Sequence, residues 1–358
     1  MTFLAKEQNK EEYLGQMTQL SKSARIQSKY VLQRFDNFCS KVYDRTEDQV
    51  VQELKMVKKT QADDEYKDYL FNKIAQPFID ELSKVYDPVN VKVLFSYFKR
   101  YLVWSGIVIY REESKIHLRF PKKSKDEKHI LTKDEVRAIC NVASPKRRML
   151  YLVLASSTMR IAETVQLRKR DIEVKDGKVT IRIKAPYTKT KEARHTFITQ
   201  EASEVLIPHL EKIKDDELVF GTNENVDFAK SREEQSFSGY RKKAGFCNCD
   251  EVGRKKCKGR YPTTTHHKIS LHSFRSYSIK TINRIDFGLG NSLAGHGYYM
   301  MTYDGMELEE KRALYKQAEQ NLSIFTSTKE MDNLTQRNEV LQDEIARLKL
   351  RMDKMDNP

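Results

Sequence analysis

The chain has 358 residues, 39% of them hydrophobic and 32% charged, a balance typical of a protein that folds into compact domains. It contains no apolar run of about eighteen residues, so a membrane-spanning helix is not predicted. The first residues lack the basic-then-apolar pattern of a secretory signal, and we expect a cytoplasmic protein. A formal net charge of +14 favours a polyanionic partner, with nucleic acid as the first candidate and a merely soluble basic protein as the alternative.

The N-terminal third of the chain has the pattern of a helical domain. Residues 1–22 are polar with few apolar anchors and are predicted to form a flexible arm. From residue 23 to about 104, apolar residues recur at steps of three and four, the period of a helix. A compact all-helical domain is therefore predicted over residues 23–115, with four helices and with its aromatic stripes in the core. The four apolar groups are Tyr30, Val31, Phe35, Phe38, Cys39; Val50, Val51, Leu54, Val57; Tyr69, Leu70, Ile74, Phe78, Ile79, Leu82; and Val91, Leu94, Phe95, Phe98, Leu102.

Residues 116–130 have one proline, many charges and little to bury, which is typical of an exposed linker. Their basic run either lies along a DNA backbone or is simply solvated. A second, mixed α/β domain is predicted over residues 131–326, and it opens with a capping box, Thr132 and Glu135. Its predicted helices are 148–155, 161–167, 201–213, 271–285 and 307–321, its strands are 179–184 and 195–198, and residues 221–269 are predicted to be polar, basic and turn-rich.

Residues 327–358 are predicted to form one segment, whose last 28 residues, from Met331, make four unbroken heptads. Ile345 at an a position with leucines at d favours a two-stranded coiled coil, and Asn338 at another a position is a register device of parallel dimers. The sequence therefore predicts a coiled-coil helix that forms a homodimer. The alternative is a single amphipathic helix that folds back on the body.

Six polar residues lie next to apolar helices or on the predicted hairpin of the second domain: Arg160, Lys189, His272, Arg275, His296 and Tyr303. Each by itself has an ordinary structural explanation. Together they match the needs of a DNA strand exchange that conserves bond energy. A tyrosine nucleophile keeps the phosphate, two arginines grip its free oxygens, a lysine protonates the leaving oxygen, and histidines assist proton transfer.

The order of these residues resembles that of the tyrosine recombinase (phage integrase) family over about residues 130–325. Tyr303, followed by Asp304 and the predicted helix 307–321, looks most like the archaeal-type integrases. The segment Thr158–Glu163 looks like the first arginine box of the family, and Thr188–Lys191 resembles its hairpin lysine motif. Leu271–Arg275 resembles its His-x-x-Arg box, and Leu293–His296 resembles the segment before the nucleophile. The resemblance implies a mainly α fold with a small β-sheet: an N-terminal helical core-binding (SAM-like) domain, a mixed α/β catalytic domain and the C-terminal coiled coil.

This sequence departs from the family pattern at two places. The interval from His296 to Tyr303 is shorter than usual, which leaves Tyr298 and Tyr299 as competing nucleophiles. The choice of Lys189 over Lys191 as general acid depends only on its place as the first lysine of a Thr-Lys-Thr turn. We expect Tyr303 and Lys189 to be the functional pair.

The resemblance implies a mechanism. Tyr303 forms a 3′-phosphotyrosyl link, Lys189 protonates the 5′-oxygen, Arg160 and Arg275 stabilise the phosphate, and His272 and His296 support proton transfer. No cofactor is required, and the implied partner is double-stranded DNA held by a tetramer in a synaptic complex at the nucleoid. Two rivals remain, a type IB topoisomerase-like relaxing enzyme and a non-catalytic DNA-binding regulator on the same fold.

Five cysteines, an odd number, argue against a disulfide framework. Three of them lie within the turn-rich stretch 221–269 together with two adjacent histidines. The set Cys247, Cys249, Cys257 and His266 offers enough soft and imidazole ligands for a structural zinc, although the spacing matches no standard finger. The alternative is free thiols in a basic loop that contacts DNA.

Overall fold

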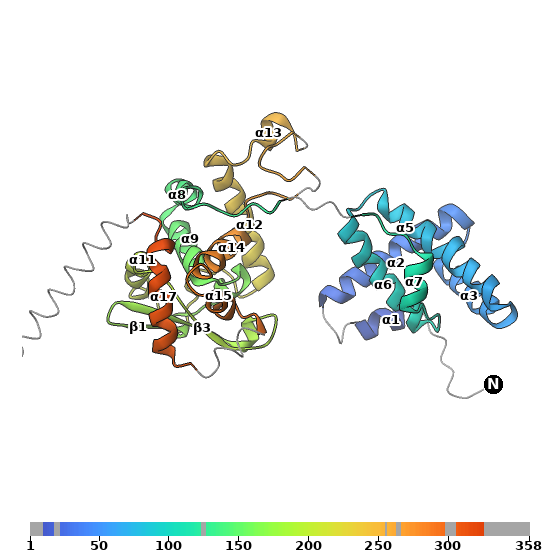
Figure 1. The fold of residues 1–358 in the computed structure, drawn as a ribbon, viewed down its shortest axis with the longest axis horizontal. Coiled ribbons are helices and arrows are strands. Elements are labelled where there is room, and N and C mark those ends of the chain that lie inside the picture. The colour runs from blue at the N-terminus through green and yellow to red at the C-terminus, as the bar shows by residue number, and fades with distance from the viewer. Residues whose placement is uncertain are drawn as a thin grey trace, which may run out of the picture. The chain divides into compact units, whose positions relative to one another are not determined.

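The computed structural model describes residues 10–17, 22–122, 127–254, 256–262, 266–297 and 306–325. The chain forms two compact units, Met1–Lys125 and Asp126–Pro358 (Figure 1). The boundary lies inside the range predicted to be a linker. Tyr298, Tyr299, Tyr303 and the predicted coiled coil lie outside the described residues.

The first unit is helical throughout its described part. The four predicted apolar groups lie on α2, α3, the continuous run α4–η1–α5, and α6, and most of their members are buried in one core. Its centre is a set of aromatic rings in mutual contact, with Phe35 against both Phe78 and Phe98. The helices are α1 (Lys10–Met17), α2 (Lys22–Tyr43), α3 (Glu47–Thr60), α4 (Asp63–Lys67), η1 (Asp68–Ala75), α5 (Gln76–Ser83), α6 (Pro88–Trp104) and α7 (Arg111–His117).

The prediction of a flexible arm over residues 1–22 is wrong for residues 10–17. This stretch is helix α1, and its Tyr13 is fully buried against the rings of Tyr101 and Trp104. Lys10 forms an ion pair with the buried carboxylate of Glu47. Three apolar residues in eight positions, Tyr13, Leu14 and Met17, give too short a period to be recognised, yet they suffice to dock a short helix on an existing core.

The predicted linker also begins too early. Leu118 is buried in the core of the first unit and Phe120 packs edge-on against Phe95. Residues 116–120 therefore belong to the first unit, because two apolar side chains among many charges are enough to fix that segment.

The second unit is built around α9 (Pro145–Ser157), whose residues Met149–Ser157 are all buried. Helices α8, α11, α14 and α17 pack against it, and Figure 1 shows them gathered around it. The capping box of Thr132 and Glu135 opens α8, as predicted. The helices of this unit are α8 (Lys133–Val142), α9, α10 (Ile161–Thr164), η2 (Lys169–Asp171), η3 (Ala185–Tyr187), α11 (Gln200–Leu210), α12 (Val226–Lys243), α13 (Cys249–Val252), α14 (Leu271–Ile282), α15 (Phe287–Leu293) and α17 (Leu308–Leu322).

A small antiparallel sheet of order β1-β2-β3 covers one side of this unit. The two predicted strands are β2 (Lys178–Ile183) and β3 (Arg194–Phe197), with Arg182 opposite His195. The sequence missed β1 (Ile172–Lys175), because its apolar–polar alternation spans only four residues, three of which are exposed.

The turn-rich prediction for residues 221–269 is wrong at its start, where α12 runs for 18 residues. Its buried stripe is Ala229, Glu233, Phe237 and Arg241, so two of the four buried positions carry charges. Glu233 is buried because Arg147 pairs with it at 2.9 Å. Because half of the buried positions carry charged side chains, the sequence of α12 shows no apolar periodicity. Among the helices of the described ranges, none combines the length and apolar character needed to cross a bilayer.

Candidate active site

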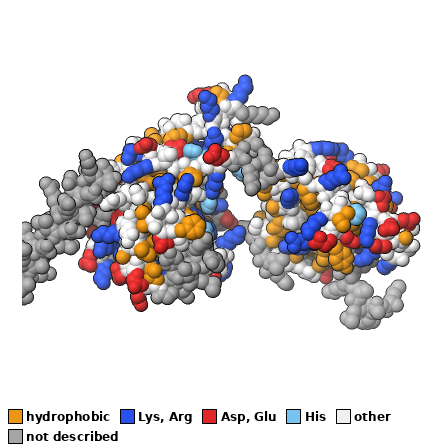
Figure 2. Space-filling model, in the orientation of Figure 1, with side chains coloured by type: hydrophobic (Ala, Val, Ile, Leu, Met, Phe, Trp, Pro, Cys, Tyr) orange, Lys and Arg blue, Asp and Glu red, His pale blue; other side chains and the backbone are white. Residues whose placement is uncertain are grey.

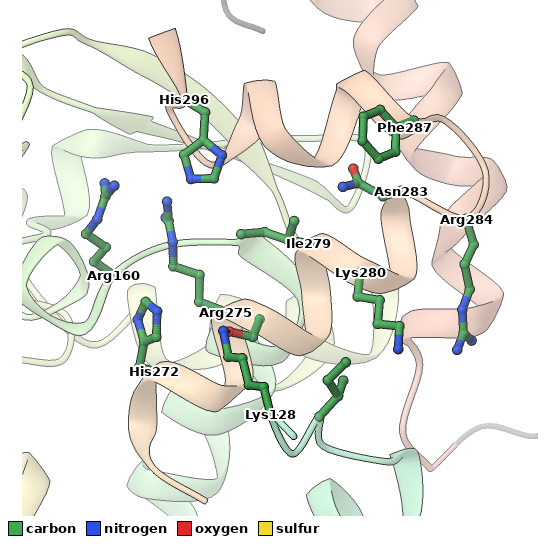
Figure 3. A pocket seen from close by; sticks show the side chains of 12 residues that line it. Lys128, Arg160, His272, Arg275, Ile279, Lys280, Asn283, Arg284, Phe287 and His296 are labelled. Atoms are coloured by element: carbon green, nitrogen blue, oxygen red, sulfur yellow. The ribbon is translucent and has the colours of Figure 1, made fainter. Parts of the chain in front are cut away.

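Segments that are far apart in the sequence meet at the end of α9 and form a pocket of about 540 Å³ (Figure 3). Four of the predicted residues line it. Arg160 stands just before α10, His272 and Arg275 lie on the first turns of α14, and His296 follows α15. Figure 3 shows the side chains of Arg160 and Arg275 extending in the same direction, with His272 and His296 on either side of them. The full lining is Lys128, Ile130, Arg160, His272, Arg275, Ser276, Ile279, Lys280, Asn283, Arg284, Phe287 and His296.

Arg275 holds two walls of the pocket together. It is 3% exposed, and its guanidinium donates to the carbonyl of Thr158 and, at 2.6 Å, to the carbonyl of Ala294. Thr158 has a left-handed backbone, φ +58°, which turns the chain sharply between α9 and Arg160. Burial, with the nearby charge of Arg160, lowers the pKa of Arg275 to about 9, so it stays a cation at neutral pH. An arginine carries five N–H donors, so three remain for a ligand.

Glu163 fixes the position of Arg160. Its carboxylate accepts from the guanidinium of Arg160 at 2.8 Å and from that of Arg194 at 2.6 Å. Burial opposes ionisation of Glu163, but Arg194 and then Arg160 outweigh it and lower its pKa below the usual value. Arg194 also donates to the carbonyl of Leu293 at 2.9 Å. The carboxylate of Glu163 therefore links strand β3, through Arg194, to the segment of Arg160. Arg194 also links strand β3 to the segment that precedes His296.

The sequence missed Glu163 and Arg194 as supporting residues. Glu163 stands three residues after Arg160 in the first arginine box, which is the spacing of a helical ion pair. That signal was available from the sequence. Nothing local marks Arg194, because its partners lie 31 and 99 residues away along the chain.

Burial and the neighbouring cations favour the neutral form of both pocket histidines. Partial burial, then Arg275, lowers the pKa of each of them, and Arg160 lowers both further. The Nδ1 atom of His296 lies 2.9 Å from the amide oxygen of Asn291. Since that oxygen can only accept, the proton belongs on Nδ1 and the free Nε2 is left as an acceptor.

The structure does not bring all the predicted residues together. Lys189 and Lys191 are exposed on the segment between β2 and β3, and neither lines the pocket. Tyr303 and its competitors Tyr298 and Tyr299 lie outside the described residues.

The structure adds cations that the sequence did not single out. Lys128, from the range predicted to be a linker, lines the pocket and reaches the hydroxyl of Ser276 at 3.4 Å. Lys280 and Arg284 continue the basic lining along α14 and just past its end. Figure 2 shows further Lys and Arg side chains spread over the visible face of both units.

The predicted zinc ligands are gathered, with one exception. The ligand atoms of Cys247, Cys249 and His267 lie within 4.8 Å of one another, and the Sγ of Cys257 is 3.8 Å from that of Cys247. His267 therefore takes the place that the sequence assigned to His266, whose side chain is exposed. His267 pairs with Arg260 in an antiparallel bridge, and successive residues of an extended chain point to opposite sides. Sequence alone does not tell which of two adjacent histidines faces inward.

A pocket with two fixed guanidinium groups, two neutral imidazoles and three further cations is suited to an anion with several oxygens. Arginine binds phosphate in a bidentate way, and preorganised donors stabilise a phosphate best as its charge grows in a transition state. The described part of the second unit is thus a mainly helical domain whose pocket is suited to bind a phosphate.

Comparison with known proteins agrees with this description. Residues 129–283, within the second unit, match the phage integrase family, the family that the motifs resemble. The match includes Arg160, Lys189, His272 and Arg275, and it ends before His296. No curated protein matches the chain.

Several solved structures are similar to the chain at low identity. The XerA recombinase is 16% identical over 86% of this chain and 98% of its own, with a TM-score of 0.37. A lambda integrase dimer bound to a core site is 14% identical over 74% and 100%, with a TM-score of 0.47. The Tn1549 transposon integrase with a circular-intermediate DNA is 12% identical over 80% and 99%, also at 0.47.

Proposed function

We propose that this protein is a site-specific DNA recombinase that cleaves and rejoins DNA through a 3′-phosphotyrosyl intermediate. The observation that carries the proposal is the convergence of Arg160, His272, Arg275 and His296 in one pocket of a phage integrase family domain. A non-catalytic DNA-binding regulator would not need two arginines fixed side by side with two neutral histidines.

In the proposed reaction, the scissile phosphate lies against Arg160 and Arg275. Their charges stabilise the two non-bridging oxygens of the pentavalent transition state. The hydroxyl of Tyr303 attacks phosphorus, and the bond to the 5′-oxygen breaks. Lys189 gives its proton to that oxygen when the segment between β2 and β3 meets DNA. A 5′-hydroxyl from the other duplex then attacks the phosphotyrosyl link and releases Tyr303.

The two histidines support proton transfer. The free Nε2 of His296 is an acceptor facing the pocket, and it suits the uptake of the tyrosine proton. His272, one turn before Arg275, is placed to donate to a phosphate oxygen or to exchange a proton with it. The chemistry needs no cofactor, since the covalent link stores the bond energy. A metal held by the Cys/His cluster would serve the fold around it, because those residues do not line the pocket.

The remaining parts of the proposal concern assembly. The first unit is proposed to be a core-binding domain that grips double-stranded DNA, and residues 327–358 a coiled coil that forms a homodimer, with a tetramer in the synaptic complex. Truncation after Thr326 tests the coiled coil. If the truncated chain keeps the oligomeric state that the full chain has in solution, the coiled-coil dimer is contradicted. The archaeal-type branch and a place at the cytoplasmic nucleoid are proposed from the sequence motifs and charge.

The decisive experiment is covalent trapping. Duplexes that the protein binds are first selected from a random pool and then nicked near the bound site, so that cleavage releases a short strand and cannot be reversed. We expect a protein–DNA adduct that survives denaturation and is lost in Tyr303→Phe, with Tyr298→Phe and Tyr299→Phe as matched controls that keep it. The absence of any adduct on the selected site would contradict the enzyme proposal. Relaxation of a supercoiled plasmid that lacks the site would favour the topoisomerase alternative.

A further inference from the structure

The three cysteines of the stretch between α12 and α14, residues 246–269 (the insertion), lie together. The Sγ atoms of Cys247 and Cys249 are 3.3 Å apart, and those of Cys247 and Cys257 are 3.8 Å apart. These separations are far longer than the roughly 2.05 Å of a disulfide. They are close to the edge of about 3.8 Å that a tetrahedron with zinc–sulfur bonds of about 2.3 Å requires. The sulfur atoms are spaced as ligands of one ion.

His267 supplies the fourth group. One of its ring nitrogens lies within 4.8 Å of the sulfur atoms of both Cys247 and Cys249. Its Nδ1 atom is buried and makes no hydrogen bond within the described residues. A buried polar atom without a partner is rare and calls for an explanation, and a bound ion is one.

The backbone of the insertion is shaped to bring these four residues together. Gly259 lies against the backbone of Phe246, whose carbonyl oxygen would be 2.0 Å from any Cβ at that position. Only glycine allows this approach, and it places the segment of Cys257 beside that of Cys247. The amide of Lys268 donates to the carbonyl of Gly259 at 2.9 Å, which brings His267 to the same place.

We propose that Cys247, Cys249, Cys257 and His267 bind one structural zinc ion, which holds the insertion together. Three thiolates, one neutral imidazole and Zn²⁺ carry a net charge of −1. The insertion supplies a compensating cation, since the Nε of Arg260 lies 3.1 Å from the Sγ of Cys249. A second guanidinium, that of Arg241 on α12, is buried beside Cys247, whose sulfur it contacts.

The insertion has little else to hold it. Within its described part, Cys247, Cys257 and Ile269 are the buried hydrophobic residues, and neither cysteine belongs to the main core. Figure 1 shows α13 and its loops standing out from the body of the second unit. A segment that buries so few apolar side chains needs a metal or a covalent link to stay folded. The carbonyl of Lys268 also accepts from Ser273 at 3.5 Å, so the ordered insertion ends where α14 and its pocket residues begin.

The test is metal analysis of the full chain without DNA. We expect one zinc per chain by mass spectrometry of the purified protein, and its loss in Cys257→Ser and in His267→Ala. Two matched controls are expected to keep it: Cys140→Ala, a buried cysteine outside the cluster, and His266→Ala, the adjacent histidine. Absence of zinc after reconstitution, or its retention in His267→Ala, would overturn the proposal.

A second measurement covers variants that fold poorly. Cobalt added to the metal-free wild-type chain is expected to give the intense visible bands of a tetrahedral site together with thiolate charge transfer. Octahedral cobalt spectra, or a Cys247–Cys249 disulfide in the freshly purified protein, would contradict a zinc site. Since neither measurement uses DNA, failure here is distinct from failure of the proposed recombinase reaction.

Discussion

The pocket and the insertion belong to the same unit, and each collects polar groups from distant parts of the chain, but they are held by different means. In and behind the pocket, the buried Arg275 and Arg194 donate to the carbonyls of Thr158, Leu293 and Ala294, so the site is part of the domain core. In the insertion the cysteines lie outside that core, and the neighbouring cysteine sulfurs and the imidazole of His267 are proposed to hold the segment through a metal ion.

This difference predicts which part of the second unit a substitution will destabilise. Removing Arg275 or Arg194 leaves buried carbonyls without partners and should weaken the whole unit. Removing a ligand of the Cys/His cluster should loosen only the insertion. The two regions should therefore respond independently. The first of three substitutions tests this independence, and the other two, with smaller expected effects, test how the pocket is held.

Arg275→Ala is expected to damage both the activity and the stability of the second unit. It removes a phosphate contact, for which loss of one preorganised donor costs about 10²–10³-fold in rate. It also leaves the carbonyls of Thr158 and Ala294 unpaired, at about 1–3 kcal/mol each. Single-turnover cleavage and urea unfolding measure the two losses. The zinc content should not change, and a parallel loss of zinc would show that the two regions are coupled.

Gly295→Ala is expected to have a smaller effect on the same wall of the pocket. Gly295 has φ +76°, and an added Cβ would lie 3.1–3.2 Å from the side chain of Arg194. Backbone strain of this kind costs about 1–3 kcal/mol, and displacement of Arg194 should also move Glu163 and Arg160. We therefore expect lower stability together with slower cleavage.

Gly245→Ala is the matched control for this substitution. Gly245 has φ +80° with no atom near an added Cβ, so it carries the strain without the collision. The Gly245→Ala control should lose stability but should cleave DNA at the wild-type rate. If the two variants cleave DNA at the same rate, the contact between Gly295 and Arg194 does not position the pocket.

Much of the site was predictable because its residues stand in local motifs. Arg160, His272, Arg275 and His296 were found in this way, and the structure places all four in one pocket. The supporting residue Arg194 was not found, because its role depends on partners that only the fold brings near. The assignment of the fourth cluster residue to His266 failed for a related reason, since the register of a two-residue bridge decides which imidazole faces the sulfur atoms.

The same reasoning applies to the fold. The four predicted helices of the first unit were recognisable because their buried stripes are almost entirely apolar. Helix α12 was not, because Glu233 and Arg241 occupy its buried face, and their burial depends on Arg147 and on the carbonyl of Ile269. A local sequence pattern does not predict the burial of a charged side chain whose partner is distant in the sequence.

Arg160→Gln is expected to have the smallest effect of the three on stability, and it tests the electrostatics of the pocket. Arg160 is one of the cations that lower the pKa of both His272 and His296, so its removal should raise both values toward the ordinary 6.5. A histidine whose folded pKa is lowered contributes stability above the unfolded pKa, and that stability is lost as the pH falls through the folded pKa. The variant should therefore lose less stability than the wild type as the pH falls below 6.5.

NMR titration of the histidine side chains measures the shifts directly. His195 is the internal control, because burial, Arg182 and Lys311 lower its pKa and Arg160 is not among the causes. We expect the midpoints of His272 and His296 to rise in Arg160→Gln while that of His195 stays in place. Equal movement of all three would indicate a general change of the fold, and no movement would mean that the pocket is too well solvated for Arg160 to act on the imidazoles. Either result would contradict a pocket whose cations are held close together by the core.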